Sequence, residues 1–327
     1  MSAIKYFPIE FNRNEYYLLS LLEMQQLTSN KFTLDISTSA FGTLRDSSDS
    51  LSDTQALQER MAADGYLYIR NLLDPELVIK ARKEVFKDLV DQGIIFPSGN
   101  LYAPKCAQAK PLKKIDFNTN KFTAVEKLHC SDAVMNFYHT FLDGEVRKFD
   151  KFWVRAIGPK SKSETVHSDI VYMGKGTRNL YTSWTPLGNI PLNQGPLMIL
   201  EKSHLLEDIK SYTDWDVDKN RNKLRYKHGV LFVGGHYSRN PPAVQKEFNR
   251  RWLSANFEMG DVLVFSAYTM HCALDNNTDI VRLSTDCRYQ LASEPIDPRW
   301  VGEDPIGNKP LGWVSNIKPW LRQRLPM

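Results

Sequence analysis

Two short stretches, far apart in the sequence, carry side chains that could bind a metal ion. The first is His167-Ser168-Asp169 and the second contains His271. Side chains on a strand repeat every two residues, so we expect His167 and Asp169 on one face of an extended segment. Two imidazoles and a carboxylate on one side of an ion are typical ligands of non-heme Fe(II), with the opposite positions open. We therefore predict that His167, Asp169 and His271 bind one iron ion.

Arg282 and Ser284 follow His271 and would share one face of a strand. A guanidinium group binds a carboxylate through two parallel hydrogen bonds, and a nearby hydroxyl can add another. The pair is therefore a candidate clamp for the distal carboxylate of a co-substrate, 2-oxoglutarate.

The order and spacing of these residues resemble the phytanoyl-CoA dioxygenase family of Fe(II)- and 2-oxoglutarate-dependent oxygenases. Other segments that match in order are 64–73, 193–197 with Ser203-His204, and 260–265, so the resemblance covers roughly residues 55–300. It implies a double-stranded β-helix, or jelly-roll, fold. It also implies that Fe(II), 2-oxoglutarate and O2 oxidise a small molecule with release of succinate and CO2, and that ascorbate serves as reductant in vitro.

The resemblance leaves the reaction and the substrate open. Hydroxylation of an unactivated carbon is the default, beside desaturation, ring closure and epoxidation, and secondary metabolism is one expected setting. Two other classes also stay open: a cupin-type metalloenzyme that needs no 2-oxoglutarate, and an inactive binding protein of the same fold. Arg282 with Ser284 argues against the first class, and the intact set of metal ligands argues against the second.

Four residues close to these motifs need separate interpretations. Trp184 lies where the family has a tryptophan beside the co-substrate, although an ordinary core aromatic is an equally good interpretation. Asp261 is expected to stabilise a turn, and His204 to be structural or to support the site from outside. Cys272 neighbours His271 on a strand, so its side chain is expected to point away from the metal.

Composition limits the class of protein. The chain has 327 residues, 42% hydrophobic and 24% charged, which is typical of a soluble globular protein. It has no long apolar stretch and no apolar signal-peptide core at its N-terminus, so we expect a cytoplasmic location and no membrane partner. The net charge of +4 is dispersed and argues against nucleic acid. The four cysteines lack paired spacing and are expected to be reduced and buried. The oligomeric state stays undetermined.

Helical patterns precede strand patterns along the chain. Helices are expected after Ser52, after Asp74, where an N-cap precedes a proline, and after Ser131. Strands are expected at 66–70, 152–157, 180–187, 196–200, 262–265 and 281–289. This order predicts an α+β fold in which helices support one face of an antiparallel barrel.

The domain organisation is predicted as three parts. Residues 1–50 form an N-terminal extension, 51–300 the dioxygenase domain and 301–327 a C-terminal tail. Within the domain, residues 205–259 are an insert expected to act as a lid, together with the segment 297–300. The insert contains a cationic run that is interpreted first as a solvated surface and second as a site for an acidic substrate group: Lys219, Arg221, Lys223, Arg225 and Lys227.

Overall fold

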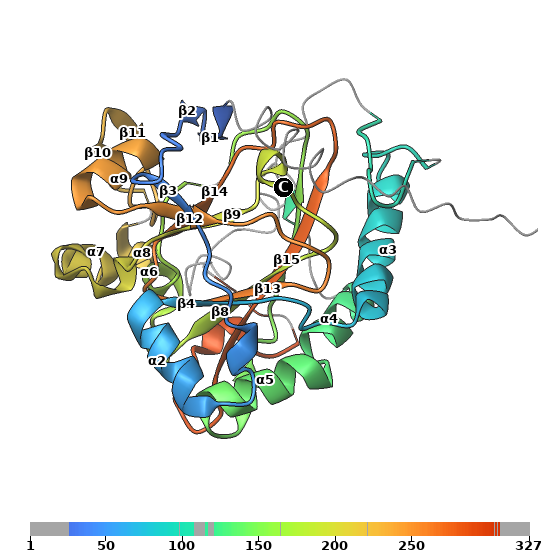
Figure 1. Cartoon of the computed structure of the whole chain (residues 1–327), viewed down its shortest axis with the longest axis horizontal. Coiled ribbons are helices and arrows are strands. Elements are labelled where there is room, and N and C mark those ends of the chain that lie inside the picture. The colour runs from blue at the N-terminus through green and yellow to red at the C-terminus, as the bar shows by residue number, and fades with distance from the viewer. Residues whose placement is uncertain are drawn as a thin grey trace, which may run out of the picture.

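Two sheets packed face to face form the centre of the molecule (Figure 1). This computed structural model describes residues 26–97, 99–107, 115–116, 121–163, 165–220, 222–303, 305 and 307. In the larger sheet the strand order is β4 (Tyr66–Ile69), β13 (Val262–Ser266), β8 (Tyr181–Pro186), β15 (Arg282–Leu291), β7 (Trp153–Ile157) and β5 (Ile115–Asp116), and β6 (Val146–Lys148) pairs with β15. In the smaller sheet it is β14 (His271–Ala273), β9 (Leu197–Leu200), β12 (Trp252–Ser254) and β3 (Phe41–Thr43).

The strand pairing confirms the predicted α+β organisation with antiparallel sheets. Within the described residues, every pair in the two sheets is antiparallel except β12 with β3, which is parallel. All six predicted strands are present with ends shifted by one or two residues. Strand β3 lies within the stretch predicted as an N-terminal extension. A small hairpin, β1 (Thr28–Ser29) with β2 (Phe32–Thr33), precedes it.

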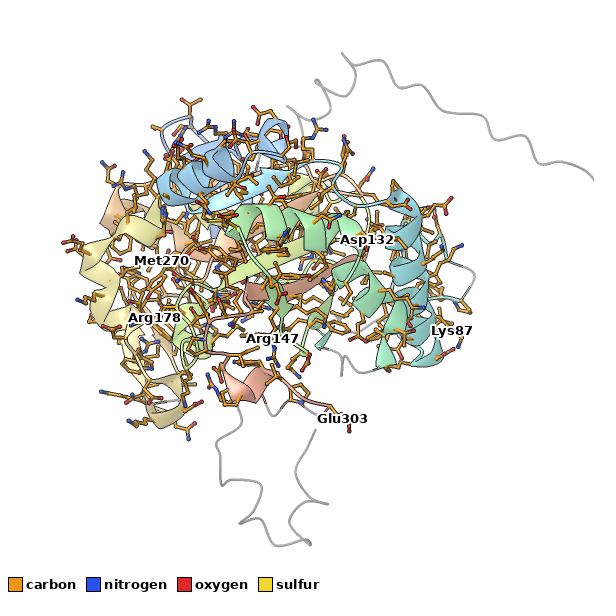
Figure 2. The ribbon with its side chains drawn as sticks, turned by 90° about the horizontal axis from the view of Figure 1, so that it is seen from below. Lys87, Asp132, Arg147, Arg178, Met270 and Glu303 are labelled. Atoms are coloured by element: carbon orange, nitrogen blue, oxygen red, sulfur yellow. The ribbon has the colours of Figure 1, made fainter. Side chains whose placement is uncertain are left out.

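Four helices cover the outer face of the larger sheet. They are α2 (Thr54–Asp64), α3 (Pro75–Asp91), α4 (Thr123–His129) and α5 (Asp132–Leu142). Asp53 and Asp74 cap the first two, because each carboxylate accepts a backbone N–H of the first turn. Figure 2 shows α3 and α5, marked by Lys87 and Asp132, away from the side where Met270 lies.

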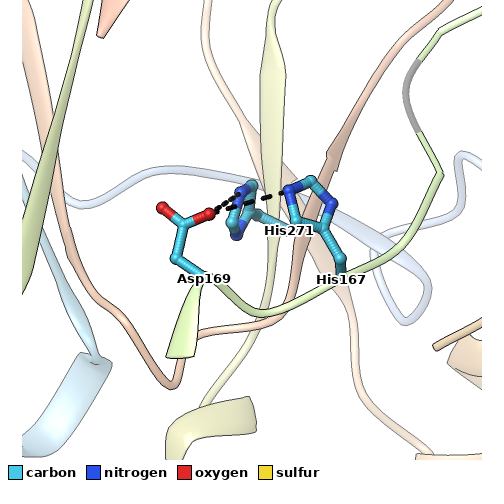
Figure 3. A group of neighbouring side chains, drawn as sticks. All are labelled: His167, Asp169 and His271. Carbon is cyan, nitrogen blue, oxygen red and sulfur yellow. Dashed lines mark ion pairs between the residues drawn. The ribbon is translucent and has the colours of Figure 1, made fainter. Parts of the chain in front are cut away.

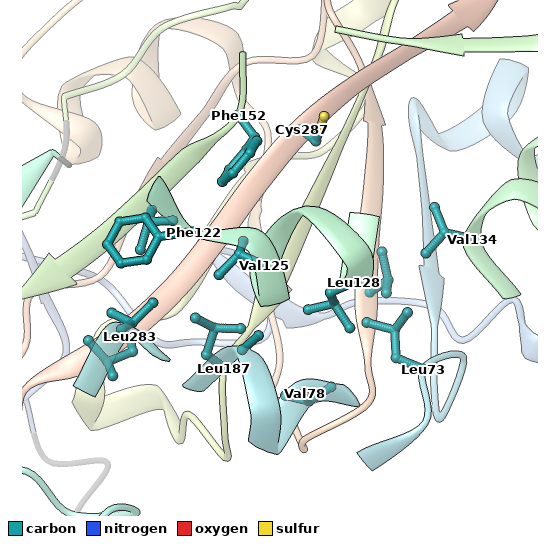
Figure 4. Packing of buried hydrophobic residues seen from close by; sticks show 14 of the residues in the cluster. Leu73, Val78, Phe122, Val125, Leu128, Val134, Phe152, Leu187, Leu283 and Cys287 are labelled. Atoms are coloured by element: carbon teal, nitrogen blue, oxygen red, sulfur yellow. The ribbon is translucent and has the colours of Figure 1, made fainter. Parts of the chain in front are cut away.

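Strand β15 separates two different environments. Its alternate residues Leu283, Cys287 and Tyr289 point outward and pack with apolar side chains of the helices, such as Val78 and Leu128 (Figure 4). Successive side chains of a strand point to opposite faces, so the residues between them point inward, toward the smaller sheet. These inward residues are all polar and buried: Arg282, Ser284, Asp286, Arg288 and Gln290. The space between the two sheets therefore carries a polar stripe along one strand.

The segment 205–259 covers the outer face of the smaller sheet. Its elements are α7 (Lys210–Thr213), α8 (Val217–Asn220), β10 (Arg225–Lys227), β11 (Val230–Phe232) and α9 (Pro241–Phe248), followed by β12. Tyr212, Val217 and Val244 pack in one apolar cluster with Met198 and Cys272 of the sheet. The segment is thus a packed layer, and its last part is itself a strand of the smaller sheet.

Other features complete the fold. Short 3-10 helices are η2 (Ser48–Ser50), η4 (Leu192–Gln194), η5 (Ser203–Leu205), η6 (Glu207–Ile209) and η7 (Pro298–Trp300). All four cysteines are free, as predicted, but only Cys272 and Cys287 are buried, whereas Cys106 is half-buried and Cys130 is exposed. No helix in the described part of the chain combines the length and the apolar character needed to cross a bilayer.

The buried His129 should make stability depend on pH. Burial, with a smaller contribution from the charge of Lys148, lowers the pKa of His129 to about 3. As the pH falls through the ordinary pKa of histidine, the unfolded chain therefore takes up a proton that the folded chain does not. Going from about pH 7.5 to about pH 5, the free energy of unfolding should fall by about 2 kcal/mol more in the native protein than in His129→Gln. Urea unfolding at each pH measures this, and parallel pH profiles would contradict it.

Candidate active site

The two candidate imidazole ligands are joined through their backbones. His167 and His271 exchange both N–H to O hydrogen bonds, at 3.1 and 2.9 Å, in an isolated antiparallel bridge. Their rings lie 4.2 Å apart between centroids. Asp169 places Oδ1 3.8 Å from Nε2 of His167 and 3.9 Å from Nε2 of His271 (Figure 3). Within the described residues, these three side chains form a group whose potential ligand atoms all lie within 4.8 Å of one another.

The conformation of Asp169 differs from the extended one that was predicted. Its φ of −63° and ψ of −28° are helical, and it directly precedes helix α6 (Ile170–Met173) instead of continuing a strand. The prediction that His167 and Asp169 share one face of a strand is therefore wrong, although the carboxylate of Asp169 does lie beside the imidazoles. The cause is α6 itself, which buries Ile170, Val171 and Met173 in the cluster outside the smaller sheet.

Each imidazole is held so that one nitrogen faces the carboxylate. Nδ1 of His167 lies 2.8 Å from the carbonyl oxygen of Thr165, and Nδ1 of His271 lies 3.0 Å from that of Thr269. A carbonyl oxygen only accepts, so Nδ1 carries the proton in both rings and Nε2 presents a lone pair to the site. Two neutral nitrogen donors and one oxygen donor fit a divalent iron ion.

The second oxygen of Asp169 is already occupied. Thr182 Oγ1 donates to Oδ2 at 2.6 Å, and Arg288 Nη2 donates to the same atom at 2.7 Å. Burial alone would raise the pKa of Asp169, but the positive charge of Arg288 and the hydrogen bond from Thr182 hold it well below its usual range. The group is therefore an ionised carboxylate with Oδ1 left toward the histidines.

A chain of charged side chains extends from Asp169 into the larger sheet. It was not predicted from the sequence. Arg288 also donates through Nη1 to Asp286, and Arg155 Nε donates to Asp286 Oδ1 at 2.6 Å. Trp153 lies under the guanidinium of Arg288, with the guanidinium carbon 4.1 Å from the ring centroid. The sequence does indicate such a chain of charges, because polar residues at every second position from 282 to 288 are unusual in a buried strand.

A small cavity of about 30 Å³ between the sheets connects the two candidate imidazole ligands with the predicted clamp. His167 and His271 line it, together with Arg282, Trp184 and Phe265. Aromatic and aliphatic side chains beside a few charged groups are typical of a small-molecule site.

The predicted clamp residues lie on the inner face of β15. Arg282 is only 2% exposed, and its Nη1 donates to the carbonyl oxygen of Gly195 at 2.7 Å. Its guanidinium carbon lies 5.8 Å from the ring centroid of Trp184. Ser284 Oγ is buried without a hydrogen-bond partner in the described part of the chain. Such a group costs free energy, which an incoming carboxylate would offset.

Three neighbouring residues have the non-ligand roles expected of them. Asp261 accepts the backbone N–H groups of Glu258 and Asn71 and thereby closes the turn before β13. His204 Nε2 lies 2.9 Å from the carbonyl oxygen of Ala62, outside the cavity. Cys272 packs in the outer apolar cluster and not with the metal ligands.

One part of the segment 205–259 reaches the metal ligands. The ring of His236 lies 6.1 Å from that of His167 between centroids, and its Nδ1 lies 3.5 Å from the hydroxyl of Tyr172. Arg299 Nη2 donates to the carbonyl oxygen of Tyr172 at 2.7 Å, and its Nη1 donates to Asp218 of α8 at 2.9 Å. The segments 297–300 and 205–259 therefore meet α6 beside His167.

Two cations of the run at 219–227 have partners within the segment 205–259. Arg225 Nη2 donates to the carbonyl oxygen of Gly234 at 2.7 Å, and its guanidinium carbon lies 4.5 Å from the ring centroid of Trp215. Lys227 forms an ion pair with Glu247 at 3.0 Å. Arg221 lies outside the described residues. Two members of the cationic run thus hold the segment together.

Comparison with known proteins gives one family and several relatives. The profile of the family described as Phytanoyl-CoA dioxygenase (PhyH) matches residues 61–284. The chain is 25% identical over 252 residues to the 1-deoxypentalenic acid 11-beta-hydroxylase of Streptomyces exfoliatus, covering 74% of this chain and 83% of the relative.

Solved structures of similar fold share little sequence with this chain. The non-heme alpha ketoglutarate dependent carbocyclase SnoK from nogalamycin biosynthesis superposes with a TM-score of 0.55 at 15% identity, covering 84% of this chain and 95% of that one. The epimerase SnoN, solved with Fe3+, alpha ketoglutarate and nogalamycin RO, gives 0.52 at 18% identity, covering 81% and 92%. These likenesses establish a shared mixed helix and sheet fold.

Replacing His271 with Ala should abolish binding of a divalent ion. The change removes one of two nitrogen donors, whereas the adjacent Cys272→Ala alters a side chain that packs outside the sheet. We expect Co(II), used as a spectroscopic stand-in for iron, to bind the native protein and the Cys272 variant but not the His271 variant. Visible absorption during a Co(II) titration measures this. Equal binding by all three proteins would contradict the ligand assignment.

Proposed function

We propose that this chain, which belongs to the phytanoyl-CoA dioxygenase family, is an Fe(II)- and 2-oxoglutarate-dependent dioxygenase that oxidises a small organic molecule. Hydroxylation is the default outcome. The observation that carries the proposal is a group of two imidazoles and a carboxylate, His167, His271 and Asp169, whose imidazoles line one cavity with the buried Arg282. The similarity to a hydroxylase over most of both chains supports it.

The proposed cofactors fit the donor atoms that are present. Nε2 of His167, Nε2 of His271 and Oδ1 of Asp169 would hold the iron. When bound, iron and 2-oxoglutarate supply the oxidation, in which O2 is consumed, 2-oxoglutarate becomes succinate and CO2, and one oxygen atom goes to the substrate. The protein supplies ligand geometry, a fixed position for the co-substrate and protection from water.

Arg282 and Ser284 would hold the distal carboxylate of 2-oxoglutarate. Both residues lie on the inner face of β15, and Arg282 lines the cavity that His167 and His271 also line. The guanidinium offers parallel N–H donors to a carboxylate, and the buried hydroxyl of Ser284 supplies a further donor. Trp184 would form the wall against which the carbon chain of the co-substrate packs.

The proposal also includes the fold type, the bounds of the catalytic domain and a lid. We interpret the two facing sheets as the two halves of a double-stranded β-helix, with the site in the space between them. Residues 51–300 would then be the dioxygenase domain. Within the segment 205–259, the part that contacts His167 around His236 is the proposed lid, held by the Arg299 contacts with Tyr172 and Asp218. A lid excludes water from the reacting centre.

Succinate production separates the proposed enzyme from its alternatives. The proposal expects succinate from 2-oxoglutarate when Fe(II), O2 and ascorbate are supplied, and faster production with a true substrate. A cupin-type metalloenzyme would turn over without 2-oxoglutarate, and an inactive binding protein would give no succinate under any condition. Screening small molecules for coupled turnover, with the mass of each product measured, would identify the substrate.

Arg282→Lys should weaken the use of 2-oxoglutarate while sparing the metal. Lysine keeps the charge but loses the planar fork, and a hydrogen bond to a charged group is worth about 1.5–3 kcal/mol. We therefore expect the KM for 2-oxoglutarate to rise about tenfold to a hundredfold. Succinate formation against 2-oxoglutarate concentration measures this, with the exposed Arg147→Lys as the matched control. An unchanged KM in the Arg282 variant would remove the clamp from the proposal.

A further inference from the structure

We propose that Arg288 is a positioning residue that makes Asp169 bind the metal through Oδ1 alone and so keeps a coordination position open for the co-substrate. The inference rests on the proposed function, because it assumes that iron and 2-oxoglutarate share this site.

The first observation is that Oδ2 of Asp169 has two donors that come from the larger sheet. Thr182 of β8 and Arg288 of β15 are direct cross-strand partners. Their side chains donate to Oδ2 at 2.6 and 2.7 Å. All three residues are at most 3% exposed, so water does not compete for these hydrogen bonds. Only Oδ1 faces the two imidazoles, at 3.8 and 3.9 Å from Nε2.

The second observation is that Arg288 is itself immobilised. One end of its guanidinium binds Asp169 and the other binds Asp286, which also accepts from Arg155. The face of Trp153 packs against the guanidinium. Negative and positive charges therefore alternate along the chain of four residues, which is how buried charges are tolerated. A planar fork holds two carboxylates from opposite ends in a fixed geometry, whereas an ammonium group donates from one nitrogen with no fixed plane.

The consequence concerns the number of open coordination positions. Three protein atoms, two atoms of an oxo acid and one of O2 fill an octahedral ion. A carboxylate free to turn could bind through both oxygens and occupy a position that the co-substrate needs. Two donors fixed on Oδ2 prevent this rotation, so the larger sheet controls how Asp169 binds the metal.

The test compares Co(II) spectra of the native protein, Arg288→Lys and the control Arg147→Lys, each without and with 2-oxoglutarate. Co(II) absorption depends on coordination number. We expect both lysine variants to bind Co(II), but only Arg288→Lys to show an altered spectrum and about tenfold weaker 2-oxoglutarate binding. A native spectrum and native affinity in Arg288→Lys would overturn the inference. Native protein that binds Co(II) but not 2-oxoglutarate would instead overturn the proposed function, and the spectra of Co(II) alone would still test Arg288.

A second variant covers the case in which Arg288→Lys does not fold. Thr182→Val removes one donor from Oδ2, keeps a similar shape and leaves every charge in place. Circular dichroism establishes folding before each titration. In folded Thr182→Val the Co(II) spectrum should shift in the same direction, with weaker 2-oxoglutarate binding than in the native protein. A spectrum and affinity identical to the native protein would overturn the inference.

Discussion

The backbone bridge between His167 and His271 is the constraint on which the site depends. It ties the edge strand of the smaller sheet to the chain that enters α6, and it places the two rings 4.2 Å apart. Asp169 then follows from the turn into α6, and the larger sheet supplies the groups that hold its carboxylate. Preformed ligands need little rearrangement when a metal arrives, so most of the ordering cost is met during folding.

Strand β15 connects this site to the rest of the fold because its two faces do different work. The outer face is apolar and fastens the strand to the helices through Leu283, Cys287 and Tyr289. The inner face carries Arg282 at one end and Arg288 toward the other. Six residues of extended chain span about 20 Å, so the clamp and the support for the metal ligand are held at a set distance by backbone geometry. Apolar packing on one side therefore positions charged groups on the other.

Residue types and spacing were enough to predict His167, Asp169 and His271 as neighbours, and Arg282 lines the same cavity as the two imidazoles. The conformation of Asp169 could not be predicted from its spacing of two residues from His167. Both a strand and a turn into a helix can bring two side chains with this spacing together. The pairing of Arg288 with Thr182 depends on strand register, which no local pattern reveals. Strand β12 was missed because three residues are too short to show a period.

The parallel strand β3 has a consequence for any shortened form of the protein. The family profile begins at residue 61, whereas β3 comprises Phe41–Thr43 and pairs with β12 along its whole length. A chain trimmed to the matched region would leave the backbone groups of Trp252–Ser254 exposed along one side. Unpaired sheet edges recruit other chains, and an apolar edge does so most readily. Residues 41–43, which precede the matched region, therefore cover an edge of the smaller sheet that could otherwise pair with another chain.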